Sequence, residues 1–213
     1  MVCTRIPQLL RSGSLRAAAH ARCLRAFSSQ PPPPSAAARR AEMLRVDHAG
    51  EVGAVEIYRG QAWVLRGTSL EGTLREMQEG EVQHLRTLDA MLGERRVRPS
   101  LLLPLWRAAG FALGVATGLL GKQVALAATV SVETSISRHY TAQVRELLEE
   151  ASAGAPQPGD DALVAVFARH RDEEVAHHDT ALSLGARDAP GFAAQDAVIQ
   201  VGCAAAISVA TKL

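Results

Sequence analysis

The sequence predicts an all-α protein, a four-helix bundle with two additional apolar helices. From Ala41 onward, apolar residues recur at helical spacing, and glycine and proline divide the chain into segments. No stretch alternates in the manner of a β-strand, which excludes a predicted sheet. At 213 residues, the chain is long enough for one domain and a tail.

Six helical segments are expected, four of them amphipathic and two apolar. Glycine or proline lies at or near each break between them, and the clearest loop is the Gly- and Pro-rich stretch at residues 151–159. The expected bounds are about 42–66, 70–93, 104–121, 122–150, 160–184 and 192–210.

The first 41 residues differ in composition from the rest. They contain seven arginines and no acidic residue, are rich in Ser and Ala, and lack a continuous apolar core. That composition is typical of a mitochondrial transit peptide, with a disordered basic arm as the alternative. Pro31–Pro34 form a stiff spacer. We therefore divide the chain into a transit peptide and Pro-rich spacer (1–41), cleaved after Phe27, and a folded domain (42–213).

Charge and cysteine content narrow the classes of function. Without the seven leader arginines, the 23 Lys and Arg fall to 16 against 22 Asp and Glu, a net charge of −6. The domain that remains is not basic, so its charge does not indicate nucleic-acid binding. Cys203 is the only cysteine of the domain, which excludes a disulfide framework and a Cys-based metal site. Any metal must be bound by oxygen and nitrogen.

Two Glu-x-x-His sequences indicate a metal centre. They are Glu81 with His84 and Glu174 with His177, and no third copy occurs in the chain. Residues three positions apart lie on one face of a helix, so each pair can hold one ion between a carboxylate and an imidazole.

The other two amphipathic helices each offer one glutamate in apolar surroundings. Glu133 is the only charged residue between positions 122 and 138, and an ionised carboxylate there is costly to bury unless it is paired or bound to metal. Glu51 likewise has uncharged, mostly apolar neighbours in the sequence. A tyrosine follows each glutamate by seven residues, Tyr58 and Tyr140, so the two halves of the chain form a weak internal repeat.

One Glu from each of two helices and Glu-x-x-His from each of two others is the ligand set of ferritin-like di-iron bundles. Bridging carboxylates hold two ions close together, and hard oxygen donors suit iron in both oxidation states. Zinc is less favoured, because its structural sites prefer cysteine. The predicted metal ligands are Glu51, Glu81, His84, Glu133, Glu174 and His177.

Other polar residues near these sequences are candidates for contact with a ligand, with simple packing as the alternative. They are His48, His139, Tyr140, Asp47 and Asp172. His170 is expected in solvent. His178 points about a hundred degrees away from the preceding ligand on a helix and is expected on the outer face or beside a ligand.

Residues 100–121 form the most apolar segment. After Arg107, fourteen uncharged residues precede the next charge, about 21 Å of helix, which is shorter than a bilayer span. We expect the segment to lie on or dip into one leaflet, with a buried core helix as the alternative. Gly110, Gly114 and Gly118 recur at every fourth position, which predicts close packing against the C-terminal helix or another subunit.

Five stretches resemble the demethoxyubiquinone hydroxylases, mitochondrial di-iron monooxygenases of ubiquinone biosynthesis. The resemblance covers about residues 42–213. It departs from many relatives at Thr134, where a second acid is common, and at Val52, where tyrosine is common. The stretches are Leu44–Glu51, Val97–Pro99, Pro104–Trp106, Arg171–Asp179 and Ile199–Cys203.

The resemblance implies a ferritin-like di-iron hydroxylase domain in which the six predicted ligands bind two iron ions. The implied reaction is hydroxylation of the benzoquinone ring of demethoxyubiquinone with dioxygen and electrons ultimately from NADH. The resemblance also implies a polyprenyl quinone substrate, peripheral contact with the matrix side of the mitochondrial inner membrane, and a lipid-binding partner in a ubiquinone-biosynthesis complex. A homo-oligomer is left open. The chain has no dinucleotide-binding sequence of its own.

Two other functions compete with this prediction. The same metal centre could serve iron storage or a peroxidase reaction, but neither needs the apolar segment or a transit peptide. A lipid-binding scaffold with a vestigial site is the non-enzymatic alternative. All six ligand positions are filled, which disfavours it.

Overall fold

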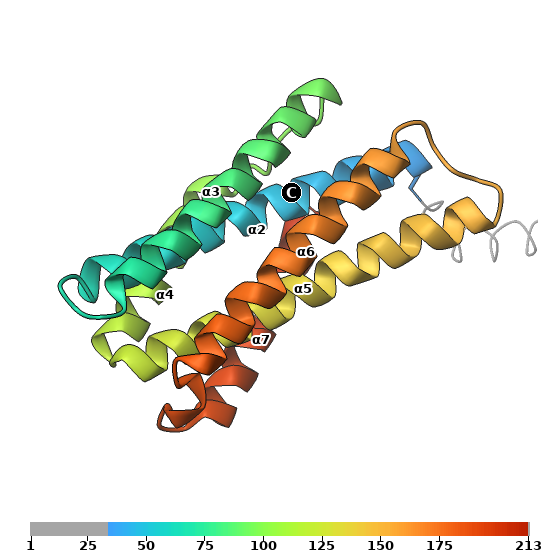
Figure 1. Cartoon of the computed structure of the whole chain (residues 1–213). Helices are drawn as coiled ribbons and strands as arrows, with labels where there is room; N and C mark the ends of the chain where they lie inside the picture. The colour runs from blue at the N-terminus through green and yellow to red at the C-terminus, as the bar shows by residue number, and fades with distance from the viewer. Residues whose placement is uncertain (1–33, 213) are drawn as a thin grey trace, which may run out of the picture. The chain divides into compact units, whose positions relative to one another are not determined.

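A computed structural model describes residues 34–212 (Figure 1). Within that range the chain forms six α-helices and one short 3₁₀ helix, and no strand, which confirms the all-α prediction. The transit peptide predicted upstream lies almost wholly outside the described residues. The elements are α2 (Ala36–Val64), α3 (Glu71–Glu94), α4 (Leu103–Leu119), α5 (Lys122–Ser152), α6 (Asp160–Ser183), η1 (Ala186–Asp188) and α7 (Phe192–Ala210).

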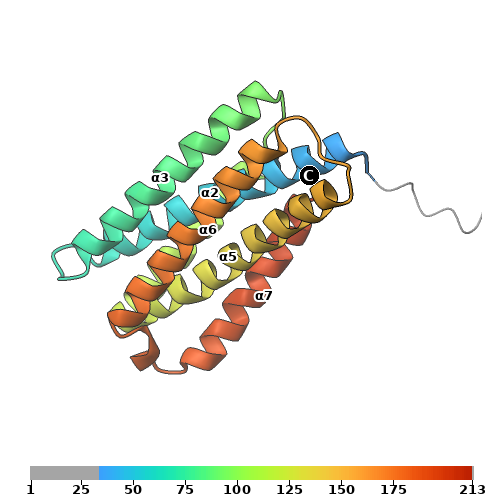
Figure 2. The same cartoon turned by 45° about the vertical axis from the view of Figure 1, so that its right-hand side comes forward.

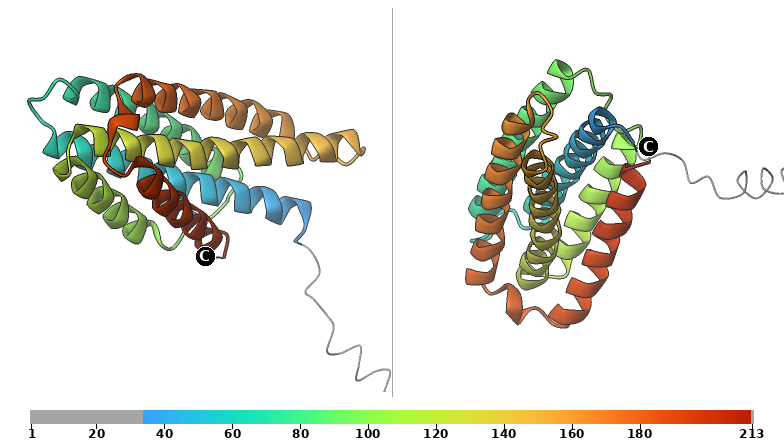
Figure 3. Two further views of the ribbon diagram at one scale, coloured as in Figure 1. Left: turned by 90° about the horizontal axis from the view of Figure 1, so that it is seen from below. Right: turned by 90° about the vertical axis from the view of Figure 1, so that its right-hand side faces the viewer.

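Two antiparallel helix hairpins build the bundle, α2 with α3 and α5 with α6 (Figures 1 and 2). Short loops join the helices of each hairpin, as is usual for antiparallel neighbours. The chain crosses from the first hairpin to the second through α4, which packs along α2, and α7 returns along α5. The right-hand view of Figure 3 shows α4 and α7 side by side, covering the layer that α2 and α5 form.

Helix α2 begins at Ala36, six residues before its predicted start. Arg39 makes two hydrogen bonds of 2.7 Å to Glu146, and the Arg40 guanidinium lies 2.8 Å from Asp160 Oδ2. An alanine-rich sequence with high helix propensity precedes these contacts, which anchor the first turns to α5 and α6. The two arginines that we grouped with the leader therefore belong to the bundle.

The glycines of α4 pack against α2, so the prediction of the C-terminal helix or another subunit as their partner is wrong. A Cβ atom on Gly114 would lie 2.1 Å from the carbonyl oxygen of Ile57, and one on Gly110 would lie 2.5 Å from that of Gly53. Helix α2 contributes glycine in return, because a Cβ on Gly60 would lie 2.5 Å from the Phe111 carbonyl. The two backbones approach so closely that side chains are excluded between them.

Two of the apolar clusters in the interior lie on either side of a polar band. On α3, Leu74 and Met77 belong to one cluster, and Leu88 belongs to the other. Phe167 of α6 lies in the second cluster and Ala181 in the first. The Glu-x-x-His sequences lie between these positions on both helices, so apolar packing shields the polar band from water at each end.

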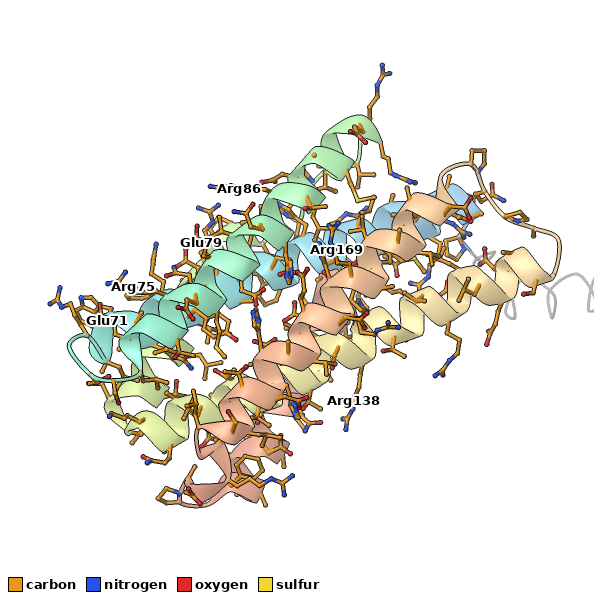
Figure 4. The ribbon with its side chains drawn as sticks, viewed as in Figure 1. Glu71, Arg75, Glu79, Arg86, Arg138 and Arg169 are labelled. Atoms are coloured by element: carbon orange, nitrogen blue, oxygen red, sulfur yellow. The ribbon has the colours of Figure 1, made fainter. Side chains whose placement is uncertain are left out.

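Helices α4 and α7 expose an apolar surface. Leu105 and Leu119 of α4 and Val198 and Val201 of α7 are all more than half exposed. Among residues 34–212, α7 is the one helix that is long and apolar enough, by length and composition, to cross a membrane. The outer faces of the other helices are charged, as the labelled side chains of α3 show (Figure 4).

Candidate metal centre

The structure brings the six predicted ligands together at the middle of the bundle. Glu51 comes from α2 and Glu133 from α5, and the Glu-x-x-His pairs come from α3 and α6. Five of the six side chains are almost completely buried, and His177 is partly exposed. Because the spacing of three residues places each Glu and His on one helix face, the local sequence fixes half of the arrangement.

These donors form two overlapping groups of four. Within each group the ligand atoms all lie within 4.8 Å of one another. Glu51 and His84 belong to one group and Glu133 and His177 to the other, while Glu81 and Glu174 belong to both. The arrangement therefore has two positions for a cation, with two shared carboxylates between them.

The imidazole Nδ1 atoms point into this cluster. His84 Nδ1 lies 3.1 Å from Glu174 Oε1 and 3.4 Å from Glu81 Oε2. His177 Nδ1 lies 2.9 Å from Glu81 Oε1 and 3.8 Å from Glu174 Oε2. Each histidine thus approaches both shared carboxylates, which is the geometry expected of two ions that share bridging ligands.

Eight buried donor atoms of the cluster have no hydrogen-bond partner among the described residues. A buried carboxylate oxygen or imidazole nitrogen without a partner is costly, and eight in one cluster are many. Metal ions at the two positions would offer partners to these atoms, so the residues present fit a bound metal. The atoms are Glu51 Oε2, Glu81 Oε1 and Oε2, His84 Nδ1, Glu133 Oε2, Glu174 Oε1 and Oε2, and His177 Nδ1.

The two tyrosines of the internal repeat bind the glutamates of the opposite helix. The Tyr140 hydroxyl on α5 donates to Glu51 Oε1 on α2 at 2.5 Å. The Tyr58 hydroxyl on α2 donates to Glu133 Oε1 on α5. Each of these glutamates thus has one oxygen fixed by a tyrosine and the other free to face the cluster.

Glu173 contacts His84 from outside the cluster, a role that our sequence analysis did not predict. Its Oε2 atom accepts a hydrogen bond from His84 Nε2. In the neutral imidazole that metal binding requires, a proton on Nε2 would leave the lone pair on Nδ1, the atom that faces the shared carboxylates. This contact would therefore favour the tautomer that suits a metal ligand. Only the position of Glu173 beside Glu174 hints at the role.

His170 is buried, and the prediction that it lies in solvent is wrong. Its side chain has 0% exposure, and its ring stacks on that of His84 with the centroids 4.1 Å apart. Its Nδ1 atom lies 3.3 Å from the Tyr140 hydroxyl. Burial and the charge of His84 lower the pKa of His170 to about 4, so the imidazole is neutral. His170 shares a helix face with Glu174, four residues later, a signal that could have placed it.

The remaining candidates lie farther from the cluster. Asp47 receives a hydrogen bond of 2.8 Å from Gln143, and His139 Nε2 lies 3.2 Å from Asp47 Oδ1. His48 bonds to Asp89 at 2.9 Å, which ties α2 to α3. Asp172 and His178 pair with their sequence neighbours on the outer face of α6. None of these contacts reaches a predicted ligand, in contrast to the hydrogen bond of Tyr140 to Glu51.

The carboxylates and imidazoles shift one another's protonation. Burial raises the pKa of Glu81 to about 7, although His177 and His84 oppose the change. Burial and the charge of Glu174 raise the pKa of Glu133 well above its ordinary value. Burial opposes protonation of His177, but Glu174 and Glu81 outweigh it and raise its pKa to about 10. The cluster therefore has excess negative charge, which protons offset and which metal cations would offset better.

An apolar pocket of about 450 Å³ lies among α2, α4, α5 and α7, and none of the six predicted ligands lines it. Gly50 and Val132 line it, and each directly precedes a predicted ligand in the sequence. Leu113 of α4 and Cys203 of α7 line the outer part. The pocket thus extends from the ligand-bearing helices to the exposed apolar surface. Its residues suit a hydrophobic molecule.

Comparison with known proteins identifies related sequences. The family model described as ubiquinone biosynthesis protein COQ7 matches residues 38–210. The NADPH-dependent 3-demethoxyubiquinone 3-hydroxylase, mitochondrial, of Mus musculus is 47% identical over 165 residues, which cover 78% of this chain and 74% of the relative. The 3-demethoxyubiquinol 3-hydroxylase of Rhodospirillum rubrum is 43% identical over 173 residues, which cover 80% of this chain and 76% of the relative. The mitochondrial 5-demethoxyubiquinone hydroxylase of Saccharomyces cerevisiae is 40% identical over 148 residues, which cover 66% of this chain and 64% of the relative.

Proposed function

Because this chain belongs to the COQ7 family of ubiquinone biosynthesis proteins, we propose that it is a di-iron monooxygenase that hydroxylates the ring of demethoxyubiquinone. The observation that supports this most directly is the pair of overlapping four-donor groups beside an apolar pocket. The donors supply a place for the metal, and the pocket supplies a place for a hydrophobic quinone.

Two iron ions are the metals that the donor set favours. Carboxylates and imidazoles without cysteine suit iron better than structural zinc. In this proposal Glu51 and His84 would hold one iron and Glu133 and His177 the other, with Glu81 and Glu174 available to both. When bound, the irons supply the activation of dioxygen, and the protein supplies the position and dryness of the site.

The residues around the ligands would hold the centre rigid. Tyr58 and Tyr140 each fix one carboxylate oxygen, which limits how far that carboxylate can turn. Glu173 holds the tautomer of His84, and the apolar clusters on either side exclude water. Ligands that are held by neighbouring groups bind metal more tightly and keep their geometry during reaction.

The substrate would bind in the apolar pocket with its ring toward the ligands. The walls nearest the cluster include glycine at positions 50 and 53, which leaves room for a flat ring. The polyprenyl tail would leave between α4 and α7, where Trp106 and Leu113 line the pocket and exposed apolar residues continue the surface. A storage or peroxidase function of the same centre has no use for this pocket.

The electrons would come from a reduced nicotinamide nucleotide. The family resemblance predicts NADH, whereas the name of the mouse relative specifies NADPH. The described helices include no strand–turn–helix unit of the dinucleotide-binding kind. Parallel assays with NADH and NADPH as the donor, at equal concentration, distinguish the two.

The proposed location is the matrix side of the mitochondrial inner membrane, in peripheral contact with the bilayer. Names of relatives place those proteins in mitochondria. The exposed apolar residues of α4 and α7 form the surface that would lie in one leaflet. A lipid-binding partner in a ubiquinone-biosynthesis complex and self-association remain part of the proposal.

Iron content and hydroxylation together test the function. We expect two coupled irons per chain by metal analysis and Mössbauer spectroscopy, and both are lost in Glu81→Ala because this carboxylate belongs to both groups. Hydroxylation of a short-chain demethoxyubiquinone should be lost with them. Glu79→Ala, an exposed position of α3, is the matched control and should keep both properties (Figure 4). Full hydroxylation by Glu81→Ala would contradict the proposal.

A further inference from the structure

A pocket with five arginines among its eleven lining residues lies at the end of the bundle where α2 begins, α3 ends and α6 begins. Figure 2 shows these three helix ends near one another. Its volume is about 470 Å³, and Asp160 is the one acidic residue among those that line it. It shares no residue with the metal centre or with the apolar pocket. The arginines are Arg40, Arg45, Arg95, Arg96 and Arg98.

The single acid of the pocket is already paired. Asp160 accepts hydrogen bonds of 3.1 and 2.8 Å from Arg40, which is only 4% exposed and also contacts Glu150. Arg40 Nη1 is buried and has no hydrogen-bond partner among residues 34–212. A buried guanidinium nitrogen without an acceptor is costly. Arg40 Nη1 therefore remains without an acceptor after Asp160 has paired with the other nitrogens of the same guanidinium.

Backbone carbonyls, not carboxylates, hold two further arginines. Arg95 Nη2 donates to the Gly159 carbonyl at 2.6 Å, and Arg45 Nε donates to the Arg98 carbonyl at 3.3 Å. Gly159 has φ of +84°, and a Cβ there would lie 2.8 Å from Arg95 Nη2, so glycine permits this contact. A carbonyl fixes the position of a guanidinium without neutralising its charge as a paired carboxylate would.

Arg96 and Arg98 complete the rim. Both are exposed, and neither forms an ion pair with a residue in the described part of the chain. Arg96 has a positive φ of 54°, a conformation that is uncommon for residues other than glycine. Four arginines without a carboxylate partner therefore face one small volume, which concentrates positive potential there.

We propose that this pocket binds the phosphate group of an organic phosphate. Guanidinium groups donate paired hydrogen bonds that match phosphate oxygens, and several of them suit a doubly charged group better than a single carboxylate. The volume exceeds the needs of a phosphate alone, and Val97 and Pro158 offer apolar contact to the remainder of the molecule. The ligand thus has a charged end at the arginines and a less polar body.

Two molecules could supply this phosphate. One is a nucleotide such as NADPH, whose adenosine carries a phosphate that NADH lacks, and this source rests on the proposed function. The other is the headgroup of an anionic phospholipid, because α4 and its exposed apolar surface begin five residues after Arg98. The chemistry of recognition is the same, and separate binding experiments distinguish the sources.

The test uses the full-length chain with two substitutions on the pocket rim, Arg96→Gln and Arg98→Gln. Both residues are exposed, so the fold should persist, which thermal melting checks. Arg75→Gln with Arg86→Gln on the outer face of α3 removes the same charge at a distance from the pocket and serves as the control (Figure 4). Arg40 is left intact because its buried ion pair stabilises the bundle.

In the nucleotide arm, calorimetry measures binding of NADPH, NADH and adenosine 2′,5′-bisphosphate. If the source is a nucleotide, the unaltered chain binds NADPH more tightly than NADH. The rim variant then loses at least tenfold in affinity for NADPH and the bisphosphate, while the control changes less than twofold. NADH binding should be equal in all three proteins.

In the vesicle arm, flotation measures binding to phosphatidylcholine vesicles with and without phosphatidic acid. If the source is a lipid headgroup, the rim variant loses the part of binding that depends on phosphatidic acid, and the control keeps it. Binding to pure phosphatidylcholine should be unchanged, because the apolar surface of α4 and α7 remains intact.

Equal binding by rim variant and control in both arms would overturn the inference, as would the absence of phosphate-dependent binding by the unaltered chain. Neither arm requires turnover. A chain that binds phosphate at the rim but lacks iron would refute the proposed enzyme and support the phosphate pocket. A chain that binds iron and hydroxylates the quinone but shows no phosphate-dependent binding would refute the pocket and support the enzyme.

Discussion

The hydroxyl of Tyr58 on α2 donates a hydrogen bond to Glu133 on α5, across the middle of the bundle. Tyr58 follows Glu51 by seven positions on the same helix, yet its hydroxyl binds the glutamate of the other hairpin. Tyr140 makes the equivalent contact in the opposite direction, to Glu51. These two contacts link α2 and α5 through the groups that would hold iron.

Removal of either tyrosine hydroxyl should weaken iron binding. Tyr58→Phe frees one oxygen of Glu133, and Tyr140→Phe frees one of Glu51, while the ring still fills its space. Loss of a group that orients a ligand typically costs about 10–100-fold in metal affinity. Competition with a ferrous chelator measures the change. Retention of iron equal to that of the unaltered chain would show that the hydroxyls do not hold the ligands.

Glu133→Gln should stabilise the metal-free protein and weaken its iron binding. Burial and the charge of Glu174 raise the pKa of Glu133, so the ionised carboxylate is unfavourable there without a cation. A neutral amide removes that cost, and we expect a gain of about 1 kcal/mol in the free energy of unfolding. Urea unfolding of the chelator-treated proteins measures it. Glu79→Gln, in solvent on α3, should change stability by less than about 0.5 kcal/mol.

Gly114→Ala should destabilise the fold. Its Cβ would lie 2.1 Å from the backbone carbonyl of Ile57, so α4 must move away from α2. Overpacking of this kind typically costs about 1–3 kcal/mol. Gly72→Ala is the control, because a Cβ there meets nothing within 4 Å and alanine favours the helix by about 1 kcal/mol. Thermal melting of the two variants should therefore shift in opposite directions, and a melt of Gly114→Ala at or above that of the unaltered chain would contradict the close packing.

The ion pair between Arg40 and Asp160 should contribute stability that is lost in acid. The hydrogen bond from Arg40 holds the pKa of Asp160 below its ordinary value. The contribution is therefore present above the unfolded pKa, about 3.9, and disappears as the pH falls through the lower folded value. Asp160→Asn leaves a buried guanidinium with less compensation and should cost about 3 kcal/mol at neutral pH.

The difference between Asp160→Asn and the unaltered chain should shrink as the pH falls below about 4. Urea unfolding at pH 7 and at pH 3 measures it. Asp161→Asn is the matched control, since that residue is exposed, and it should change stability little at either pH. A difference that is the same at both pH values would rule out the ion pair as its source.

A quinone in the apolar pocket should protect Cys203 from alkylation. Cys203 lines the pocket, and burial raises the pKa of its thiol, so its reaction is slow even in the free protein. Mass spectrometry of the peptide that contains Cys203 measures the rate with and without a short-chain demethoxyubiquinone. We expect at least a fivefold slower rate with the quinone, and equal rates would place the substrate elsewhere.

Much of the site follows from the sequence because helical spacing determines it. The period of 3.6 residues places Glu81 with His84 and Glu174 with His177 on single faces, and the isolation of Glu133 in an apolar helix marks it. The structure then brings the six predicted residues together in two overlapping groups. These features depend on one helix at a time, which is what a sequence describes well.

Features that depend on two helices could not be predicted in the same way. The sequence places Tyr58 near Glu51 in register, but which glutamate it binds depends on the offset between α2 and α5. The charged neighbours of His170 suggested solvent, whereas its face of α6 is buried. A glycine stripe indicates close packing without naming the partner, although Gly53 and Gly60 on α2, seven residues apart, are a complementary signal.

The exchange of tyrosines has a consequence for the ancestry of the chain. A contact that occurs twice with the roles reversed is what a twofold axis produces, as in a symmetric dimer. Helices α2, α3 and α4 on one side, and α5, α6 and α7 on the other, repeat the same order of lone glutamate, Glu-x-x-His and apolar cover. Each half holds only part of each four-donor group. A single gene that encodes two fused copies of one three-helix ancestor would inherit this symmetry, with the metal centre on the old dimer axis.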